Sequence, residues 1–205
     1  METKQENADI EHFNRRAATY ETASSQGYFF DRVQRRVLQL TKDQDSPEVV
    51  MDVGCGTGRL LRKARQQWPN AKLVGADAAE KMIAKATQLF PEAEFHVAMA
   101  EALPLPEASV DLAFSTLSFH HWANQAKGIS EVARVLRPQG RFVLADIVIP
   151  RWMSVFVGNF RYNSPATVRN MFTKAGLTVD LQQQPWSWSR VLLVTVGAKV
   201  IGGKS

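Results

Sequence analysis

From about residue 48 onward, apolar segments of strand length alternate with segments whose apolar residues recur at helical spacing. Strands that alternate with helices in this way are joined by right-handed crossovers into a parallel sheet covered on both faces. The strands are expected at 48–53, 72–76, 94–98, 110–114, 141–148, 177–181 and 191–198. The helices are expected at 57–67, 78–90, 126–136 and 165–175. The sequence therefore predicts an α/β fold of the Rossmann-like, doubly wound kind.

The carboxyl-terminal part of this pattern differs from the rest. The last two strands have no helix between them, which predicts a hairpin, so that a mainly parallel sheet of seven strands ends on an antiparallel one. The helix before the hairpin is expected to start at Ser164-Pro165 and to end at Gly176, which suits a left-handed cap. Before the fifth strand, Pro138 and Gly140 are expected to break the preceding helix.

Composition narrows the possible partners. The chain has a net charge of +5, but its basic residues are spread over several predicted helices, where solvated helix faces are the usual explanation. This distribution argues against a nucleic-acid partner. Cys55 is the only cysteine, so an intrachain disulfide and a thiolate metal cluster are excluded, and no metal site is expected. The sequence has no apolar run long enough to span a bilayer and no signal-peptide pattern, so a cytoplasmic protein is expected.

The segment VVMDVGCGTG at 49–58 carries the most specific signal for a ligand. A buried strand leads to Asp52, and glycines at 54, 56 and 58 then open a helix. Glycine lets the backbone turn tightly and lets a ligand approach without a β-carbon in the way. A dinucleotide-binding turn requires Gly-x-Gly-x-x-Gly, but position 59 is Arg59. The turn therefore suits a nucleoside ligand without a pyrophosphate.

With this turn, the sequence resembles the class I S-adenosylmethionine-dependent methyltransferases, in the branch typified by ubiquinone and menaquinone methylases (methyltransferase type 11). The resemblance covers residues 49–147, with a looser match beyond. Further matching segments are AEALPLP at 100–106, SVDL at 109–112, FHHW at 119–122 and EVARVLRPQG at 131–140. The resemblance implies S-adenosylmethionine as the cofactor, with S-adenosylhomocysteine as its product.

The resemblance also implies roles for individual residues. Gly54 and Gly56 would lie close to the methionine part and the ribose of the cofactor, and Asp52 would hold the ammonium group of the cofactor through a water molecule. Asp77 would accept both ribose hydroxyls, with a helix N-cap as the alternative. Tyr20 would close over the cofactor, with a core aromatic as the alternative. The other expected cofactor-site residues are Cys55, Gly58, Ala78, Met82, Met99, Ala100, Glu101 and Ser115.

Two positions depart from the family pattern. Where the family has Asp or Asn before Ala100, this chain has Met99, whose thioether packs on rings but accepts hydrogen bonds poorly. Glu101 is a substitute acceptor for the adenine amino group, and a surface acid at a helix start is the alternative. Gln139 stands where the family commonly has glycine, which is expected to affect only the local turn.

Methyl transfer needs an aligned nucleophile, and a base only where the acceptor must lose a proton. His120 and His121 follow the fourth strand, at the carboxyl edge of the sheet where doubly wound folds bind ligands. Either histidine is a candidate to orient or deprotonate an acceptor, and packing is the alternative. The segment 151–162, rich in aromatic residues, is expected to build the acceptor pocket or to form a hydrophobic cover. Trp186 and Trp188 are interpreted as packing residues.

The chain is expected to form one domain, because 205 residues suit a single core. Helical stretches at 10–20 and 28–40 precede the first strand. Residues 1–45 are therefore expected to form a helical lid, 46–150 the cofactor-binding core, and 151–205 a substrate-side segment with the closing strands.

The function predicted from the sequence is methylation of a small molecule, with aromatic and quinone-like compounds as the candidate acceptors. Methylation of nucleic acid or protein stays open as an alternative, although Ser115–Ser118 replaces the Asn/Asp-Pro-Pro-Tyr segment of amino-group methylases. A regulatory protein that binds the cofactor without turnover also stays open, and Met99 favours it. The sequence indicates neither the acceptor atom nor the oligomeric state.

Overall fold

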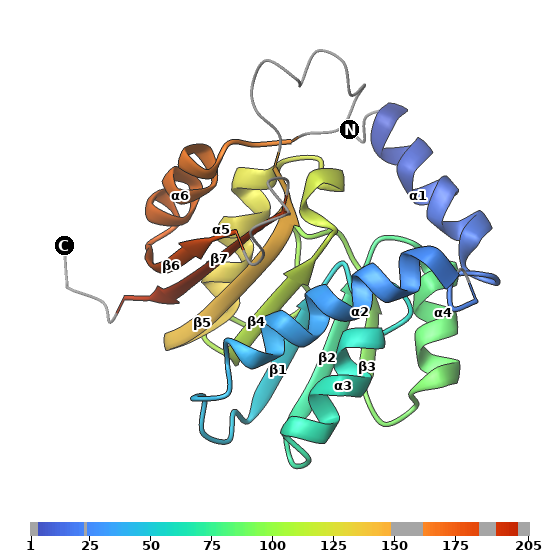
Figure 1. The fold of residues 1–205 in the computed structure, drawn as a ribbon, viewed down its shortest axis with the longest axis horizontal. Helices are drawn as coiled ribbons and strands as arrows, with labels where there is room; N and C mark the ends of the chain where they lie inside the picture. Colours follow the sequence, from blue (N-terminus) through green and yellow to red (C-terminus); the bar gives the residue numbers. More distant parts are fainter. Residues whose placement is uncertain (1–3, 23, 149–161, 185–191, 201–205) are drawn as a thin grey trace.

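The computed structural model describes residues 4–22, 24–148, 162–184 and 192–200, which form a sheet between layers of helices (Figure 1). The strands are β1 (Val49–Val53), β2 (Lys72–Asp77), β3 (Glu94–Val97), β4 (Val110–Thr116), β5 (Leu136–Ile147), β6 (Leu177–Gln183) and β7 (Leu192–Lys199). The helices are α1 (Lys4–Arg16), α2 (Ser24–Gln39), α3 (Arg59–Gln67), α4 (Glu80–Leu89), α5 (Gln125–Val135) and α6 (Pro165–Lys174), with a 3-10 turn at Phe119–His121. No helix among these residues is both long and apolar enough to span a membrane.

The sheet has the strand order β3-β2-β1-β4-β5-β7-β6. Strand β7 is antiparallel to both of its neighbours, and the other paired strands are parallel. The predicted seven-stranded, mainly parallel sheet with an antiparallel last strand is therefore confirmed. Between β1 and β4 the order of the strands reverses, and the carboxyl ends of these strands form the edge where doubly wound sheets bind ligands.

Apolar side chains hold a helical layer on each face of the sheet. On the face turned toward the viewer in Figure 1, α2 and α3 bury Val33, Val37 and Leu60 against the strands. On the opposite face, α5 and α6 bury a second cluster that includes Ile129 and Phe172. Both layers are needed because a parallel sheet is apolar on both sides.

The two amino-terminal helices have different roles. Val33 and Val37 of α2 are completely buried, so α2 belongs to the layer that covers the sheet. Helix α1 packs against α4 and lies near the carboxyl ends of the strands (Figure 1). Of the region predicted to be a lid, α1 thus lies near the carboxyl edge of the sheet, and α2 covers one face of it.

Several element boundaries differ from the sequence prediction for local reasons. Helix α3 begins at Arg59 because Gly58 still has a left-handed φ of 74°. Helix α4 begins at Glu80 because the turn before it is organised by the side chain of Asp77, which accepts a hydrogen bond from Ala79 N. By contrast, the predicted caps of α6 are confirmed, since Ser164 is the N-cap and Gly176 has a φ of 80°.

The expected break before the fifth strand lies inside a longer strand. Leu136 pairs with Val110, and Arg141 pairs with Leu112, so the residues between them bulge out of the ladder. Gln139 occupies the left-handed region with a φ of 66°. A residue with a β-carbon is strained there, which explains why glycine suits this position.

Replacing Gln139 with glycine is therefore expected to stabilise the protein by about 0.5–1 kcal/mol, the relief of left-handed strain less the larger entropy of an unfolded glycine. Thermal unfolding measures this as a rise of roughly 2 °C in Tm. As a matched control, Gln66→Gly in the exposed part of α3 is expected to lower Tm, because its backbone is helical. A lower Tm for Gln139→Gly would contradict the strain argument.

Candidate cofactor and acceptor site

The glycine turn after β1 is closed against the neighbouring strand. The amides of Gly54 and Cys55 both donate to the carbonyl of Ala76 at the end of β2, at 2.8 and 3.1 Å. Gly54, Gly56 and Gly58 all have positive φ angles, and a β-carbon on Gly54 would lie 1.8 Å from Ser118 Oγ. The turn thus requires glycine both for its conformation and for the close approach of the loop after β4.

Asp77 is held in a fixed orientation at the end of β2. Its Oδ2 accepts a hydrogen bond from Gly56 N at 2.8 Å, and its Oδ1 accepts one from Ala79 N at 2.9 Å. Burial raises the pKa of this carboxyl, and the two backbone donors oppose that rise. The N-cap of α4 is Ala79, so Asp77 does not cap the helix in the strict sense. Each oxygen keeps a second lone pair for a ligand.

Asp52 is buried at the end of β1, with 2% of its surface exposed. Its Oδ1 has no hydrogen-bond partner among the described residues. Burial, with a smaller contribution from the charge of Asp77, raises its pKa to about 8. A buried carboxylate without a partner is costly, so this oxygen is a candidate to receive a cationic ligand group.

A cavity lies over the glycine turn at the carboxyl edge of the sheet, and most of the predicted cofactor-site residues line it. These are Tyr20, Gly54, Gly56, Asp77, Ala78, Met82, Met99, Ala100 and Glu101. We refer to it as the cofactor cavity. Asp52 and Cys55 instead line a smaller pocket beside it, which shares Tyr20, Gly54 and Gly56 with the larger one.

Two predicted residues lie elsewhere. Gly58 does not line these cavities, and it packs on Phe95, whose ring would be 2.8 Å from a β-carbon at this position. Ser115 is completely buried, and its Oγ has no hydrogen-bond partner among the described residues. Because successive side chains of a strand point to opposite faces, the neighbour Thr116 lines the cofactor cavity instead of Ser115.

Glu101 is buried and is not a surface acid. Its Oε1 accepts a hydrogen bond from Asn124 N at 2.7 Å, and its Oε2 has no partner among the described residues. The half-buried Met99 lines the same part of the cavity. One oxygen of Glu101 is thus fixed by the loop before α5, which leaves the other available in place of the acceptor that Met99 lacks.

His120 forms a pair with Asp146 of β5. The Nδ1 atom of His120 lies 2.6 Å from Asp146 Oδ1, and the backbone amide of His120 donates to Asp146 Oδ2 at 2.9 Å. Both side chains are buried, and the ring of Tyr162 stacks on that of His120 with centroids 5.4 Å apart. A carboxylate at Nδ1 favours the tautomer that carries its proton there, so that Nε2 is the basic nitrogen.

His121 lies against α1. Its Nδ1 is 3.4 Å from Asp9 Oδ2, and the ring of Phe13 meets its face edge-on at 5.0 Å. Burial, followed by the neighbouring His120, lowers the pKa of His121 to about 4. The ring of His121 is therefore neutral near pH 7.

A second cavity of about 640 Å³ lies beside the cofactor cavity. Its volume is within the range of small-molecule sites. The two cavities share the residues Asp9, Phe13, Tyr20, Phe30, Leu117 and His121, and the second is also lined by His120. A ligand in the second cavity would therefore contact the same wall as a ligand in the first. We refer to it as the acceptor cavity.

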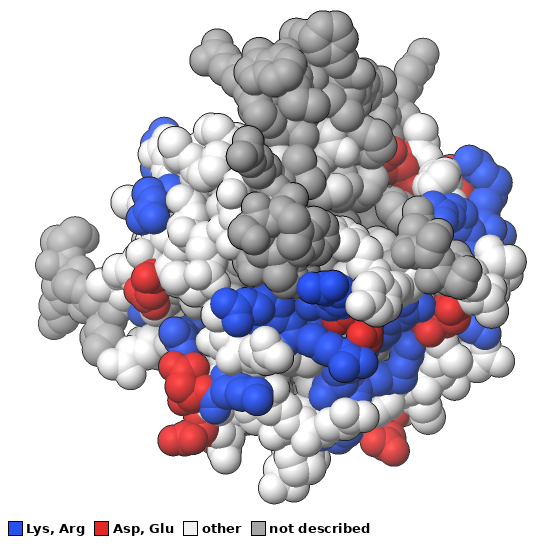
Figure 2. All heavy atoms as spheres, viewed as in Figure 1, with Lys and Arg blue, Asp and Glu red and all other residues white. Residues whose placement is uncertain are grey.

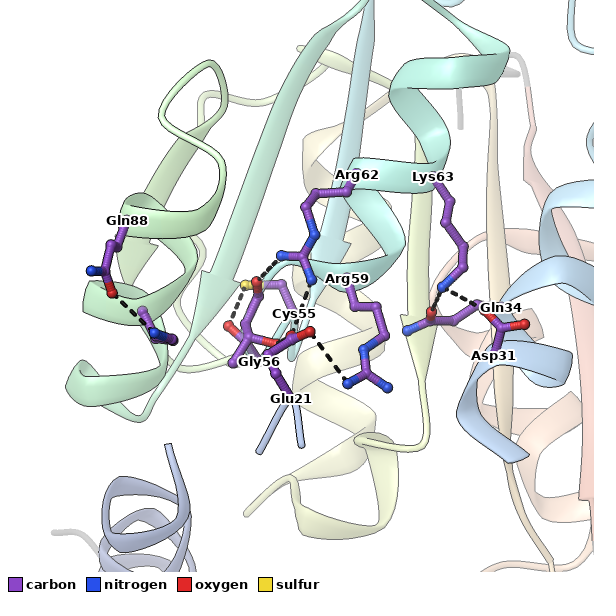
Figure 3. A network of polar contacts seen from close by, with 11 residues as sticks. Glu21, Asp31, Gln34, Cys55, Gly56, Arg59, Arg62, Lys63 and Gln88 are labelled. Carbon is purple, nitrogen blue, oxygen red and sulfur yellow. Dashed lines mark hydrogen bonds and ion pairs between the residues drawn. The ribbon is translucent and has the colours of Figure 1, made fainter. Parts of the chain in front are cut away.

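The turn after α1 is tied to α3 by ion pairs. Glu21 accepts from Thr57 Oγ1 and lies 3.0 Å from Arg62 Nη2 and 3.4 Å from Arg59 Nη2 (Figure 3). These contacts hold Tyr20, the adjacent residue, between the cavities.

Several site residues were not predicted from the sequence. Asp146 has a recognisable signal, because it is an acid near the end of an apolar strand, as Asp77 is. Trp122 lies in the FHHW segment that resembles the family, whereas Asp9 and Phe30 have no comparable signal. Residues 151–161, Trp186 and Trp188, for which packing or acceptor contacts are predicted, lie outside the described residues.

Comparison with known proteins agrees with this geometry. Residues 51–144 match the family model described as "Methyltransferase domain". A demethylmenaquinone methyltransferase of Thermus thermophilus is 34% identical over 58% of this chain and 56% of its own length. A trans-aconitate 2-methyltransferase of Azoarcus sp. is 36% identical over 52% of this chain and 41% of its own. The chain thus spans about half the length of the curated relatives it matches.

A solved structure shows the same fold at low sequence identity. The 1,6-didemethyltoxoflavin-N1-methyltransferase of Burkholderia thailandensis superposes with a TM-score of 0.72 at 18% identity, covering 98% of this chain and 92% of its own. The order of the strands, the glycine turn and the matched segment are together similar to those of one family, the class I S-adenosylmethionine-dependent methyltransferases. Within that family, the similarity to demethylmenaquinone methyltransferases points to the ubiquinone/menaquinone-methylase-like branch.

Proposed function

We propose that this protein transfers a methyl group from S-adenosylmethionine to a small, flat acceptor whose reacting atom first loses a proton. One observation carries the proposal: the His120–Asp146 pair borders an acceptor cavity that shares a wall with the cofactor cavity. This arrangement supports catalysis over a purely regulatory role, because cofactor binding alone needs no buried base.

The residues around the cofactor cavity suit S-adenosylmethionine. The unpartnered Oδ1 of Asp52 would receive the ammonium group, directly or through water. The two oxygens of Asp77 match the two adjacent ribose hydroxyls, and their orientation is already fixed by Gly56 and Ala79. Glu101 Oε2 is an acceptor for the adenine amino group.

When bound, the cofactor supplies an electrophilic methyl group on a positively charged sulfur. The protein's own contribution is to hold the acceptor, to remove its proton and to exclude water. His120 Nε2 would take the proton from the acceptor, and Asp146 would stabilise the resulting imidazolium at Nδ1. His121 in the shared wall stays neutral, so it adds no repulsion toward a cationic cofactor.

The walls of the acceptor cavity favour a planar molecule. Phe13, Phe29 and Phe30 line it together with the rings of His120 and His121. Aromatic walls of this kind stack on flat, electron-rich rings. The name of the Thermus thermophilus relative, a demethylmenaquinone methyltransferase, supports a quinone-like acceptor.

Calorimetric titration with S-adenosylhomocysteine tests the cofactor part of this proposal. We expect the intact protein to bind and Asp77→Asn to bind tenfold to a hundredfold more weakly, the size of one lost charged hydrogen bond (about 1.5–3 kcal/mol). The matched control is Glu80→Gln, an exposed acid three residues away that should bind like the intact protein. Melting temperatures show whether each variant is folded. Absence of binding by the folded intact protein would contradict the proposal.

A further inference from the structure

Basic side chains from α2 and α3 gather on one face of the molecule. The sequence suggested that they were spread over separate helix faces, but packing α2 beside α3 brings them together. Figure 2 shows the Lys and Arg atoms as a band across the face that carries these two helices. We define the α2–α3 basic patch by the following residues: Arg32, Arg35, Arg59, Arg62 and Lys63.

The patch accounts for most of the charge of the chain. Its five basic residues surround two acids, Glu21 and Asp31, which gives a net charge of +3 out of the chain's +5. The rest of the chain therefore carries a net charge of only +2. A field concentrated on one face orients the protein toward a polyanionic surface.

The two acids within the patch are each bracketed by two cations. Asp31 lies 2.7 Å from Arg35 Nε and 2.9 Å from Lys63 Nζ. Glu21 is bracketed in the same way by Arg59 and Arg62 (Figure 3). Each group of three keeps a net positive charge, and the pair of Asp31 with Lys63 links α2 to α3.

Helix α2 also presents an aromatic side chain to solvent. Tyr28 is 70% exposed, the highest value among the large apolar or aromatic side chains described. The guanidinium of Arg32 lies 5.8 Å from the centre of its ring. Tyr28, Arg32 and Arg35 are spaced by four and three residues, so they share one face of the helix. The other side of the same helix contributes Phe29 and Phe30 to the acceptor cavity.

We propose that the α2–α3 basic patch binds the surface of a membrane that contains anionic phospholipids. Basic residues near such a surface are attracted by its negative potential, and an exposed tyrosine suits the boundary between headgroups and water. Membrane binding would place α2, a wall of the acceptor cavity, against the bilayer. The binding itself does not depend on the proposed methyl transfer.

A membrane fits the patch better than a nucleic acid does. Glu21 and Asp31 lie inside the patch and would face phosphates of fixed spacing, whereas lipid headgroups can rearrange around them. Proteins that bind single strands also provide several stacking aromatics. Among the described residues, Tyr28 is the only Phe, Tyr or Trp whose side chain is mainly exposed.

Co-sedimentation of the full chain with vesicles tests this proposal. We expect binding to phosphatidylcholine vesicles that contain about 30% phosphatidylglycerol, no binding to pure phosphatidylcholine, and release at about 0.5 M salt. The double variant Arg32→Gln/Arg35→Gln should bind the anionic vesicles about 25-fold more weakly, about fivefold for each arginine. Glutamine retains much of the packing of the arginine stem.

The matched control is Arg169→Gln/Lys174→Gln on α6, which removes the same charge from exposed positions on another helix and should bind like the intact protein. Calorimetry with S-adenosylhomocysteine confirms that the variants are folded, and it tests the cofactor site separately. Equal binding to both vesicle types, or equal loss in the two double variants, would overturn the proposal. So would tighter binding of a mixed-sequence RNA that is lost in Arg32→Gln/Arg35→Gln, because the patch would then be a nucleic-acid site.

Discussion

Replacing His120 with alanine is expected to lower kcat by roughly 10²–10⁴-fold, the usual contribution of a positioned base. Its Nδ1 is held by Asp146 at 2.6 Å, so the ring enters the reaction with its orientation already set. The rate of S-adenosylhomocysteine formation with an acceptor found by screening measures the effect. The affinity for S-adenosylhomocysteine should change little, because His120 lines the acceptor cavity and not the cofactor cavity.

Three further variants and a rescue by imidazole separate catalysis from packing. His96→Ala, on the edge strand β3, is the matched control and should keep full activity. Asp146 is a positioning residue, so Asp146→Asn should lower kcat with little change in KM, and Asp146→Glu should recover part of the loss. Added imidazole should partly restore His120→Ala, because it replaces the missing base. Full activity of His120→Ala would show that the acceptor reacts without this base.

The second large effect is expected at Asp52. Asp52→Asn should weaken the binding of S-adenosylhomocysteine at pH 8 by about a hundredfold, since losing one member of a buried charge pair costs about 3 kcal/mol or more. The matched control is Asp45→Asn, an exposed acid that should bind like the intact protein. Titration calorimetry of both variants measures the difference. Unchanged binding by Asp52→Asn would show that the ammonium group is held elsewhere.

The raised pKa of Asp52 also predicts that the affinity for S-adenosylhomocysteine depends on pH. A pKa of about 8 without ligand means that the carboxyl carries a proton at pH 6, and that proton must leave before the ammonium can pair with it. The affinity of the intact protein should therefore rise about tenfold per pH unit up to pH 8, and the affinity of Asp52→Asn should not.

The contribution of Asp52 to protein stability should have the opposite pH dependence, falling where the affinity rises. Because the pKa of Asp52 in the folded protein is raised, its contribution favours the fold at low pH and is lost as pH rises toward 8. Without ligand, Asp52→Asn should therefore be the more stable protein at pH 8, by a few kcal/mol. Thermal unfolding at pH 5 and at pH 8 measures this, and a lower Tm of the variant at pH 8 would contradict the assigned pKa.

Much of the cofactor site was predictable because its signals are local. The turn from Asp52 to Gly58 places an acid and three glycines within seven residues, and the backbone they need is encoded at those positions. Asp77 is the last residue of its strand, so its place at the carboxyl edge comes from the α/β alternation. The caps Ser164 and Gly176 are local in the same way.

The face of the sheet to which each strand side chain points was harder to predict. Ser115 was expected in the cofactor site, but the pleat of β4 turns Thr116 to the cavity instead. A shift of one residue reverses which side chains face a ligand. That register is set by pairing with β1 and β5, and segment boundaries in a sequence do not resolve it.

The sequence by itself determined the order of strands and helices, the glycine turn and the two carboxylates beside it, because each of these depends on residues close together in the chain. Only the tertiary structure brought Asp146 to His120, Asp9 to His121, and the cations of α2 to those of α3. His121 and Asp9 are 112 residues apart, so their contact exists only once α1 has packed near the carboxyl ends of the strands. Such contacts arise from how the layers pack on the sheet. A local pattern of residues does not specify which distant part of the chain it will contact.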